Sequence, residues 1–314
     1  MMSPELADVQ EARDRIADSV HQTPVMRSQH LDAHTGAELF FKCEHLQKAG
    51  AFKARGATNA VLSLEESEDV AGVATHSSGN HGAALAMAAT IRGLPAYIVM
   101  PANASAVKKS AVAAYGGEII ECESTLAARE AMLASVLERT GAVVVHPYND
   151  PRVIAGQGTA ALELMEQAPD LDVIVVPVGG GGLLAGTALA VKGLNPRIEV
   201  VAVEPEGADD AFRSFGLGSL QAQTNPNTIA DGLRASLGEL NFEIIRKHVD
   251  TIITVPDAAI VDAMKLHWTR MKQVVEPSGA VGLAGVLEHP ERFRGRRVGV
   301  VVSGGNVDID HLPW

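Results

Sequence analysis

Residues 173–188 read VIVVPVGGGGLLAGTA, and this stretch decides the fold. An apolar run indicates a buried strand, four glycines indicate a tight turn, and small apolar residues then indicate the start of a helix. Glycines let a backbone approach an anion closely, and the free N–H groups at a helix start attract negative charge. We therefore predict a phosphate site at this turn. The alternative is a tightly packed turn that binds nothing.

The same alternation of short β-branched runs and Ala-rich stretches continues along the chain. The predicted strands are residues 39–42, 72–75, 96–100, 118–121, 143–146, 173–178, 199–203, 251–255 and 298–302. The predicted helices include residues 82–92, 105–115, 125–140, 156–168 and 183–193, with an amphipathic helix near the N-terminus. This order is typical of βαβ units and a mostly parallel sheet, in which ligands bind beyond the carboxyl ends of the strands.

Composition and charge exclude several classes of partner. The 314 residues carry 26 Lys and Arg against 38 Asp and Glu, a net charge of −12, and only 4% are aromatic. This balance argues against a nucleic-acid binder or an anionic-membrane binder, because both partners attract a basic surface. Neither a signal sequence nor a long apolar stretch is found, so we expect a cytoplasmic location. Cys43 and Cys122 show no zinc-ligand spacing.

A second turn, residues 74–82, is unusually polar and reads ATHSSGNHG. Ser77, Ser78, Asn80 and His81 surround Gly79 where a helix is predicted to begin. Such donors suit a carboxylate-sized anion. The alternative is an ordinary capped helix start, but a cap needs only one of these side chains.

Two further segments carry candidate chemistry. Lys53 follows Phe52 and lies among small residues, a setting in which a second cation nearby would lower the lysine pKa, as a Schiff-base amine requires. Ser303 ends the strand at residues 298–302 and precedes Gly304 and Gly305, so it too lies at a strand's carboxyl end.

The glycine turn alone leaves a nicotinamide-dependent oxidoreductase open. Gly180, Gly182 and Ala185 fit a loose dinucleotide fingerprint, and Glu204 ends the next strand at the distance of a ribose-binding acid. The rest of the sequence offers no evident hydride-transfer pocket.

Taken together, the four segments resemble the fold type II pyridoxal-phosphate enzymes, in the group of serine racemase and the serine, threonine and 3-hydroxyaspartate dehydratases. The resemblance covers nearly the whole chain, from about residue 23 to residue 308. It implies an α/β fold of two open, parallel-type αβα domains with the active site between them. The large domain would comprise residues 1–68 and 148–314, and the small domain residues 69–147.

The resemblance assigns roles within these motifs. Lys53 would bind pyridoxal phosphate and move the substrate's Cα proton, with Ser78 on the opposite face. The cofactor ring would be flanked by Phe52 and bound by Asn80 and Ser303, and its phosphate would be held by Gly179, Gly180, Gly181 and Gly182. The substrate's α-carboxylate would be bound by Ser77, Asn80 and His81.

Two further matches narrow the choice of enzyme within this group. Glu204, the Ala208 carbonyl and Asp210 resemble a site for a divalent cation, Mg²⁺, Ca²⁺ or Mn²⁺, whose preferred ligands are oxygens; the alternative is an acidic first turn of a helix. Arg129 matches an arginine directed at the substrate, and its planar fork suits a second carboxylate. The alternative for Arg129 is a solvent-exposed helix charge.

The resemblance therefore predicts a lyase that dehydrates and deaminates a β-hydroxy amino acid, 3-hydroxyaspartate ahead of serine and threonine, as a homodimer. A hydroxyl at the cofactor's pyridine nitrogen gives a weaker electron sink than a carboxylate, which favours loss of the β-hydroxyl. Serine racemase is the alternative, although Ala235 stands where the racemase has a substrate-side serine. Gln29 and Ala49 replace hydroxyls of the racemase's nucleotide site, which argues against ATP activation. An oxidoreductase and a non-catalytic binding protein are the alternatives from other classes.

Overall fold

The computed structural model describes residues 3–65, 70–77, 79–104 and 106–314, and it contains two sheets. The larger sheet has the strand order β1-β2-β10-β7-β8-β9. Its strands are β1 (Val25–Met26), β2 (Glu38–Lys42), β7 (Val173–Pro177), β8 (Glu199–Pro205), β9 (Thr251–Val255) and β10 (Arg297–Val301). Only β1 is antiparallel to its neighbour, so the carboxyl ends of the other five strands share one edge.

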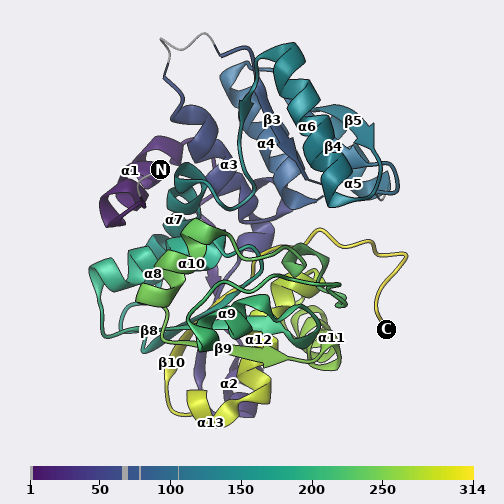
Figure 1. Cartoon of the computed structure of the whole chain (residues 1–314). Coiled ribbons are helices and arrows are strands. Elements are labelled where there is room, and N and C mark those ends of the chain that lie inside the picture. Colours follow the sequence, from purple (N-terminus) through teal and green to yellow (C-terminus); the bar gives the residue numbers. More distant parts are fainter. Residues whose placement is uncertain (1–2, 66–69, 78, 105) are drawn as a thin grey trace.

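The smaller sheet has the order β5-β4-β3-β6 and is wholly parallel. Its strands are β3 (Val73–His76), β4 (Ala96–Pro101), β5 (Glu118–Cys122) and β6 (Val143–Val144). Helices α4 (Asn80–Arg92), α5 (Ala106–Ala114) and α6 (Leu126–Thr140) pack against it and form the upper part of the molecule in Figure 1.

The remaining helices pack around the larger sheet or join the two parts (Figure 1). They are α1 (Leu6–Ile16), α2 (Gln29–Thr35), α3 (Lys53–Leu62), α7 (Pro151–Gln167), α8 (Gly182–Leu194), α9 (Asp210–Leu217), α10 (Glu239–His248), α11 (Asp257–Leu266), α12 (Pro277–Glu288) and α13 (Pro290–Phe293). None of the described residues forms a helix of the length and apolar character needed to cross a membrane.

The central strand β7 shows why its sequence is continuously apolar. Ile174 and Val176 pack with α7 and α8, whereas Val173 and Val175 pack with α11 and α12 on the other face. Successive strand residues point to opposite faces, and helices cover both faces of this sheet. The run at residues 173–178 therefore has no exposed side.

These observations confirm the predicted α/β class and the parallel sheets. Most predicted boundaries differ from the structure by one or two residues; β6, for example, ends at Val144 because the chain then turns at His146. The largest difference is at α7, which begins at Pro151 because Asp150 accepts a hydrogen bond from the Arg152 N–H and Pro151 suits a first helical turn. The domain limits at residues 68/69 and 147/148 stay a prediction. Helix α3, from the N-terminal side of that limit, packs with α4 in the core beside the smaller sheet.

Candidate active site

The segment that carries Lys53 is joined to the turn that carries Ser303. The Phe52 N–H donates to the Ser303 carbonyl at 3.0 Å, and Ala51 forms a β-bridge with Gly304. Ser303 is buried at the end of β10, and its hydroxyl donates to the Ser278 carbonyl at 3.3 Å. Two motifs 250 residues apart in sequence thus lie side by side at the carboxyl edge of the larger sheet.

Lys53 begins α3, and no carboxylate pairs with it within the part of the chain that the structure describes. Its Nζ donates to the Pro147 carbonyl at 2.8 Å and lies 5.0 Å from the centre of the Phe52 ring. Burial lowers the pKa of Lys53 to about 8. The cause is loss of water rather than the neighbouring cation that the sequence suggested. A lysine with this pKa has a substantial neutral fraction near physiological pH and is nucleophilic.

The glycine turn is shaped by its neighbours. A Cβ at Gly180 would lie 2.4 Å from Cγ of Tyr148, and one at Gly179 would lie 2.8 Å from the Leu233 Cα. Gly181 has φ 91°, which L side chains rarely adopt. Helix α8 begins directly after it without a side-chain cap, so its first N–H groups remain open to a ligand.

The side chains of the polar turn after β3 are only partly open to solvent. Ser77 is half-buried, and its hydroxyl oxygen accepts a 3.4 Å hydrogen bond from the Gly79 N–H. His81 is buried, with Nε2 3.1 Å from the Val145 carbonyl and Nδ1 unpartnered among the described residues. Burial, followed by the charge of Lys53, lowers the pKa of His81 to about 3, so its imidazole is neutral. Ser78 lies outside the described residues.

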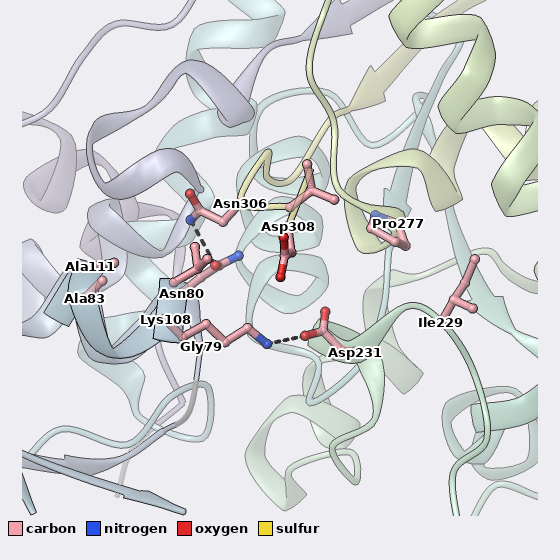
Figure 2. A pocket seen from close by; sticks show the side chains of 12 residues that line it. Gly79, Asn80, Ala83, Lys108, Ala111, Ile229, Asp231, Pro277, Asn306 and Asp308 are labelled. Carbon is pink, nitrogen blue, oxygen red and sulfur yellow. Dashed lines mark hydrogen bonds and ion pairs between the residues drawn. The ribbon is translucent and has the colours of Figure 1, made fainter. Parts of the chain in front are cut away.

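Asn80 is held by two residues that the sequence analysis missed. Its side-chain N–H donates to Glu276 Oε1 at 2.8 Å. Its side-chain oxygen accepts a hydrogen bond from Asn306 at 3.0 Å, which Figure 2 shows. Glu276 is buried; its burial, and then the charge of Asp231, raises its pKa to about 8. A glutamate directly before the proline that opens an apolar helix was the available signal for it.

A cavity of about 290 Å³ opens beside Asn80, between the two parts of the molecule. Figure 2 shows Lys108 of α5 and Asp231, from the loop between α9 and α10, pointing toward one another across the cavity. The two side chains form an ion pair. The cavity's other polar lining side chains are Asn306 and Asp308. The cavity therefore joins the polar turn to the loop after β10.

Glu204 and Asp210 lie together at the start of α9. Glu204 accepts the N–H groups of Ala211 and Phe212 at 3.1 and 2.8 Å, and Asp210 accepts that of Leu237 at 2.7 Å. Burial raises the pKa of Glu204 to about 9 and that of Asp210 to about 6. Among the described residues no group of three or more His, Cys, Asp or Glu is placed to hold a metal. The predicted set has only two acidic side chains, its third ligand being the Ala208 carbonyl.

Arg129 extends from the first turn of α6 and is half-buried. Its Nε donates to the Thr125 carbonyl at 3.4 Å, and no ion pair to a carboxylate is found for it within the described part of the chain. Burial, followed by the Arg129 charge, lowers the pKa of His76 at the end of β3. The guanidinium thus lies near the carboxyl edge of the smaller sheet, and no carboxylate among the described residues pairs with it.

Comparisons with known proteins decide the family. The pyridoxal-phosphate-dependent enzyme family matches residues 16–304. The chain belongs to that family. It is 52% identical over its full length to the whole of a β-hydroxyaspartate dehydratase from Paracoccus denitrificans. A serine racemase from Arabidopsis thaliana is 50% identical, with 98% of this chain and 95% of that protein covered. The structure of maize serine racemase has a TM-score of 0.96 and 50% identity, covering 98% of this chain and 95% of that one.

The residues present fit pyridoxal phosphate. A nucleophilic lysine, an uncapped helix start behind a turn that side chains would fill, and a buried serine hydroxyl meet at one edge of the larger sheet. These supply an amine for the aldehyde, N–H donors for the phosphate and a hydroxyl for the ring nitrogen. The family match sets aside the two alternatives from other classes, the oxidoreductase and the non-catalytic binding protein.

Proposed function

We propose that this enzyme dehydrates and deaminates 3-hydroxyaspartate, releasing a keto acid and ammonia. The observation that carries the choice of substrate is the uncommitted guanidinium of Arg129, half-buried with no carboxylate partner among the described residues. A charged fork without a partner suits the side-chain carboxylate of hydroxyaspartate, which serine and threonine lack. The 52% identity to the Paracoccus β-hydroxyaspartate dehydratase supports the same choice.

Different residues of this chain would carry out different parts of the reaction. When bound, pyridoxal phosphate withdraws electrons from the substrate's Cα. The Lys53 amine removes the Cα proton, for which a pKa of about 8 suits it near neutral pH. Ser77 and Asn80 would orient the α-carboxylate, the Ser303 hydroxyl would bind the ring nitrogen, and the helix start after Gly181 would hold the phosphate. Ser78, on the opposite face, stays a prediction from the sequence.

Glu204, the Ala208 carbonyl and Asp210 are proposed to bind a divalent cation, Mg²⁺, Ca²⁺ or Mn²⁺. Burial raises the pKa of Glu204 and of Asp210, and the nearby Arg213 charge offsets only part of the rise at Asp210. A cation would let both ionise and would fix the start of α9. Chelation is expected to lower the melting temperature, which added Mg²⁺ or Ca²⁺ should restore. No change on chelation would contradict this site.

The substrate test measures keto-acid and ammonia release from the stereoisomers of serine, threonine and 3-hydroxyaspartate. Arg129→Ala should lower kcat/KM for 3-hydroxyaspartate by about 100-fold, because it removes charge-assisted hydrogen bonds, and should leave serine turnover within about twofold. Arg139→Ala, in the last turn of the same helix, is the matched control. An unchanged preference in Arg129→Ala would contradict the assignment.

A serine racemase with dehydratase activity is the second candidate, favoured by 50% identity to the Arabidopsis racemase. Chiral analysis of serine after incubation distinguishes the two. Accumulation of the opposite enantiomer faster than keto acid would favour the racemase. The homodimer and the cytoplasmic location stay predictions from the sequence.

A further inference from the structure

His146 closes a tight turn shortly after β6. Its Nδ1 accepts the N–H groups of Tyr148 and Asn149 at 3.3 and 2.9 Å. A ring nitrogen that accepts carries no proton, so the proton of this neutral imidazole lies on Nε2. A protonated imidazole has no acceptor, and the two hydrogen bonds therefore require His146 to be neutral.

The far end of this turn is fastened to the glycine turn. The Asn149 side-chain oxygen accepts the Leu240 N–H at 3.1 Å. The Asn241 side-chain amide donates to the carbonyls of both Tyr148 and Gly180, at 3.1 and 2.6 Å. The Tyr148 ring occupies the space that a Cβ at Gly180 would need, 2.4 Å from that position to Cγ. The turn is thus fixed relative to the site assigned to the cofactor phosphate.

The peptide unit between Pro147 and Tyr148 connects His146 to Lys53. The N–H of this unit donates to His146 Nδ1 at 3.3 Å, and its carbonyl accepts from Lys53 Nζ at 2.8 Å. The unit is trans and planar, so its N–H and its carbonyl point in opposite directions. The imidazole on one side therefore fixes the direction of the carbonyl on the other. It also strengthens the carbonyl as an acceptor, because hydrogen bonds in a chain polarise one another.

We propose that the Pro147 carbonyl holds the Lys53 amine whenever the amine is free of cofactor, and that His146 is the positioning residue that fixes this carbonyl. This rests on the proposed role of Lys53 as the group that takes the substrate's Cα proton. An amine that has left the cofactor must stay in one place to take that proton, and a fixed acceptor keeps it there. A carbonyl also stabilises the protonated amine that results. The alternative role for His146 is only to close the turn.

The groups that face this arrangement keep the imidazole neutral. Burial, and then the charges of His76 and Lys53, lower the pKa of His146 to about 4, whereas Asp150 raises it. The His76 and His146 rings meet edge-on with centres 6.3 Å apart, and His81 faces Lys53. His146 is therefore an acceptor throughout the neutral pH range, as its two hydrogen bonds require.

Paired substitutions separate the two roles. His146→Asn keeps an acceptor, since an Asn side chain can bind the N–H two residues on, whereas His146→Leu removes it. The rate at which pyridoxal phosphate binds covalently to the full-length apoenzyme is followed by absorbance against pH, because only the neutral Lys53 amine adds to the aldehyde. We expect the midpoint of this profile to fall by about one pH unit in His146→Leu, where a hydrogen bond to the protonated amine is lost. In His146→Asn it should fall by less than half as much.

Turnover supplies a second readout. In His146→Leu, kcat for the preferred hydroxy amino acid should fall about tenfold, because the amine is no longer held in place, with KM within about twofold of the wild type. His146→Asn should recover most of kcat. His34→Leu, at an exposed position of α2, is the matched control and should change neither the midpoint nor kcat.

The outcomes separate the two proposals. Equal midpoints in the wild type and both His146 variants, or equal shifts in the two variants, would overturn the role of His146. Should His146→Leu not fold, NMR of the wild type with isotope-labelled histidine locates the imidazole proton, with His146→Asn assigning the signal. A proton on Nε2 would support the proposal, and one on Nδ1 would overturn it. A wild type that releases no keto acid from 3-hydroxyaspartate would overturn the proposed function and leave these apoenzyme measurements unchanged.

Discussion

Lys53 and Arg55 lie two residues apart on α3, yet their charges have opposite surroundings. Arg55 is fully buried between Glu44 and Glu163, with four N–H···O contacts of 2.7–2.8 Å to their carboxylates. Burial alone would lower the pKa of Arg55, but the two carboxylates raise it above its ordinary value. Among the described residues, the hydrogen-bond partner of Lys53 is a backbone carbonyl and not a carboxylate, and burial lowers its pKa to about 8.

The difference separates structural charge from reactive charge. A buried cation with matched anions is fixed in one protonation state and holds elements together. A buried cation without them can lose its proton near neutral pH and act as a base or nucleophile. Helix α3 thus carries a reactive charge on its first residue, in the active site, and a structural charge on its third residue, in the core.

The largest effect is expected at Lys53. Lys53→Ala should lower dehydration by at least about 10³-fold, since it removes both the cofactor-binding amine and the proton acceptor. Keto-acid release measures it, and Lys247→Ala on the exposed part of α10 is the control. Substantial activity in the lysine variant would mean that the unpaired charge is not the reactive one.

The paired charge should matter for stability instead. Glu44→Gln removes one anion from buried Arg55 and should lower the free energy of unfolding by about 3 kcal/mol. Urea denaturation measures this change. Glu166→Gln, which breaks the exposed pair with Arg13, should cost less than about 1 kcal/mol. Equal losses in the two variants would refute the distinction between buried and exposed pairs.

Glu276 extends the comparison to a buried acid whose hydrogen-bond partner is the neutral amide of Asn80. Its pKa is raised from 4.5 to about 8, so the folded apoprotein holds a proton that the unfolded chain releases between these values. Stability should therefore fall as pH rises from 4.5 to 8. Glu276→Gln should remove part of that fall and raise the melting temperature at pH 8, measured against the wild type across this range. A variant with an unchanged pH profile would contradict the shift.

The smallest effect is expected at the exposed ion pair across the cavity (Figure 2). Asp231→Asn removes a carboxylate partner of Lys108, and both side chains are partly open to water. A double-mutant cycle with Lys108→Met should give a coupling of at most about 1 kcal/mol in unfolding free energy. A coupling of several kcal/mol would place this pair with the buried network instead.

The parts of the site that were predictable are local in sequence. The glycine turn, Lys53 and Ser303 each follow or precede a recognisable strand or helix, so their placement at one sheet edge follows from parallel topology. Glu276 and Tyr148 were missed because each belongs to the site through a tertiary contact, Glu276 with Asn80 and Tyr148 with Gly180. No local sequence pattern predicts either contact.

The same limit applies to the fold. Helices packed on two-sided sheets were predictable from apolar runs, but the two-residue strand β1 was not, because it forms only by pairing with β2. The ion pair of Arg55 with Glu163 joins residues 108 positions apart. The sequence around Arg55 does not show that two distant carboxylates will bind it, because packing decides which cation receives them.

The central claim is that Lys53 is the reactive lysine, and covalent trapping tests it most directly. The holoenzyme is treated with borohydride, digested, and mapped by mass spectrometry. We predict that the peptide containing Lys53 carries the reduced cofactor and that peptides containing Lys48, Lys108 and Lys272 do not. A reduced cofactor on another lysine, or on none, would contradict the assignment.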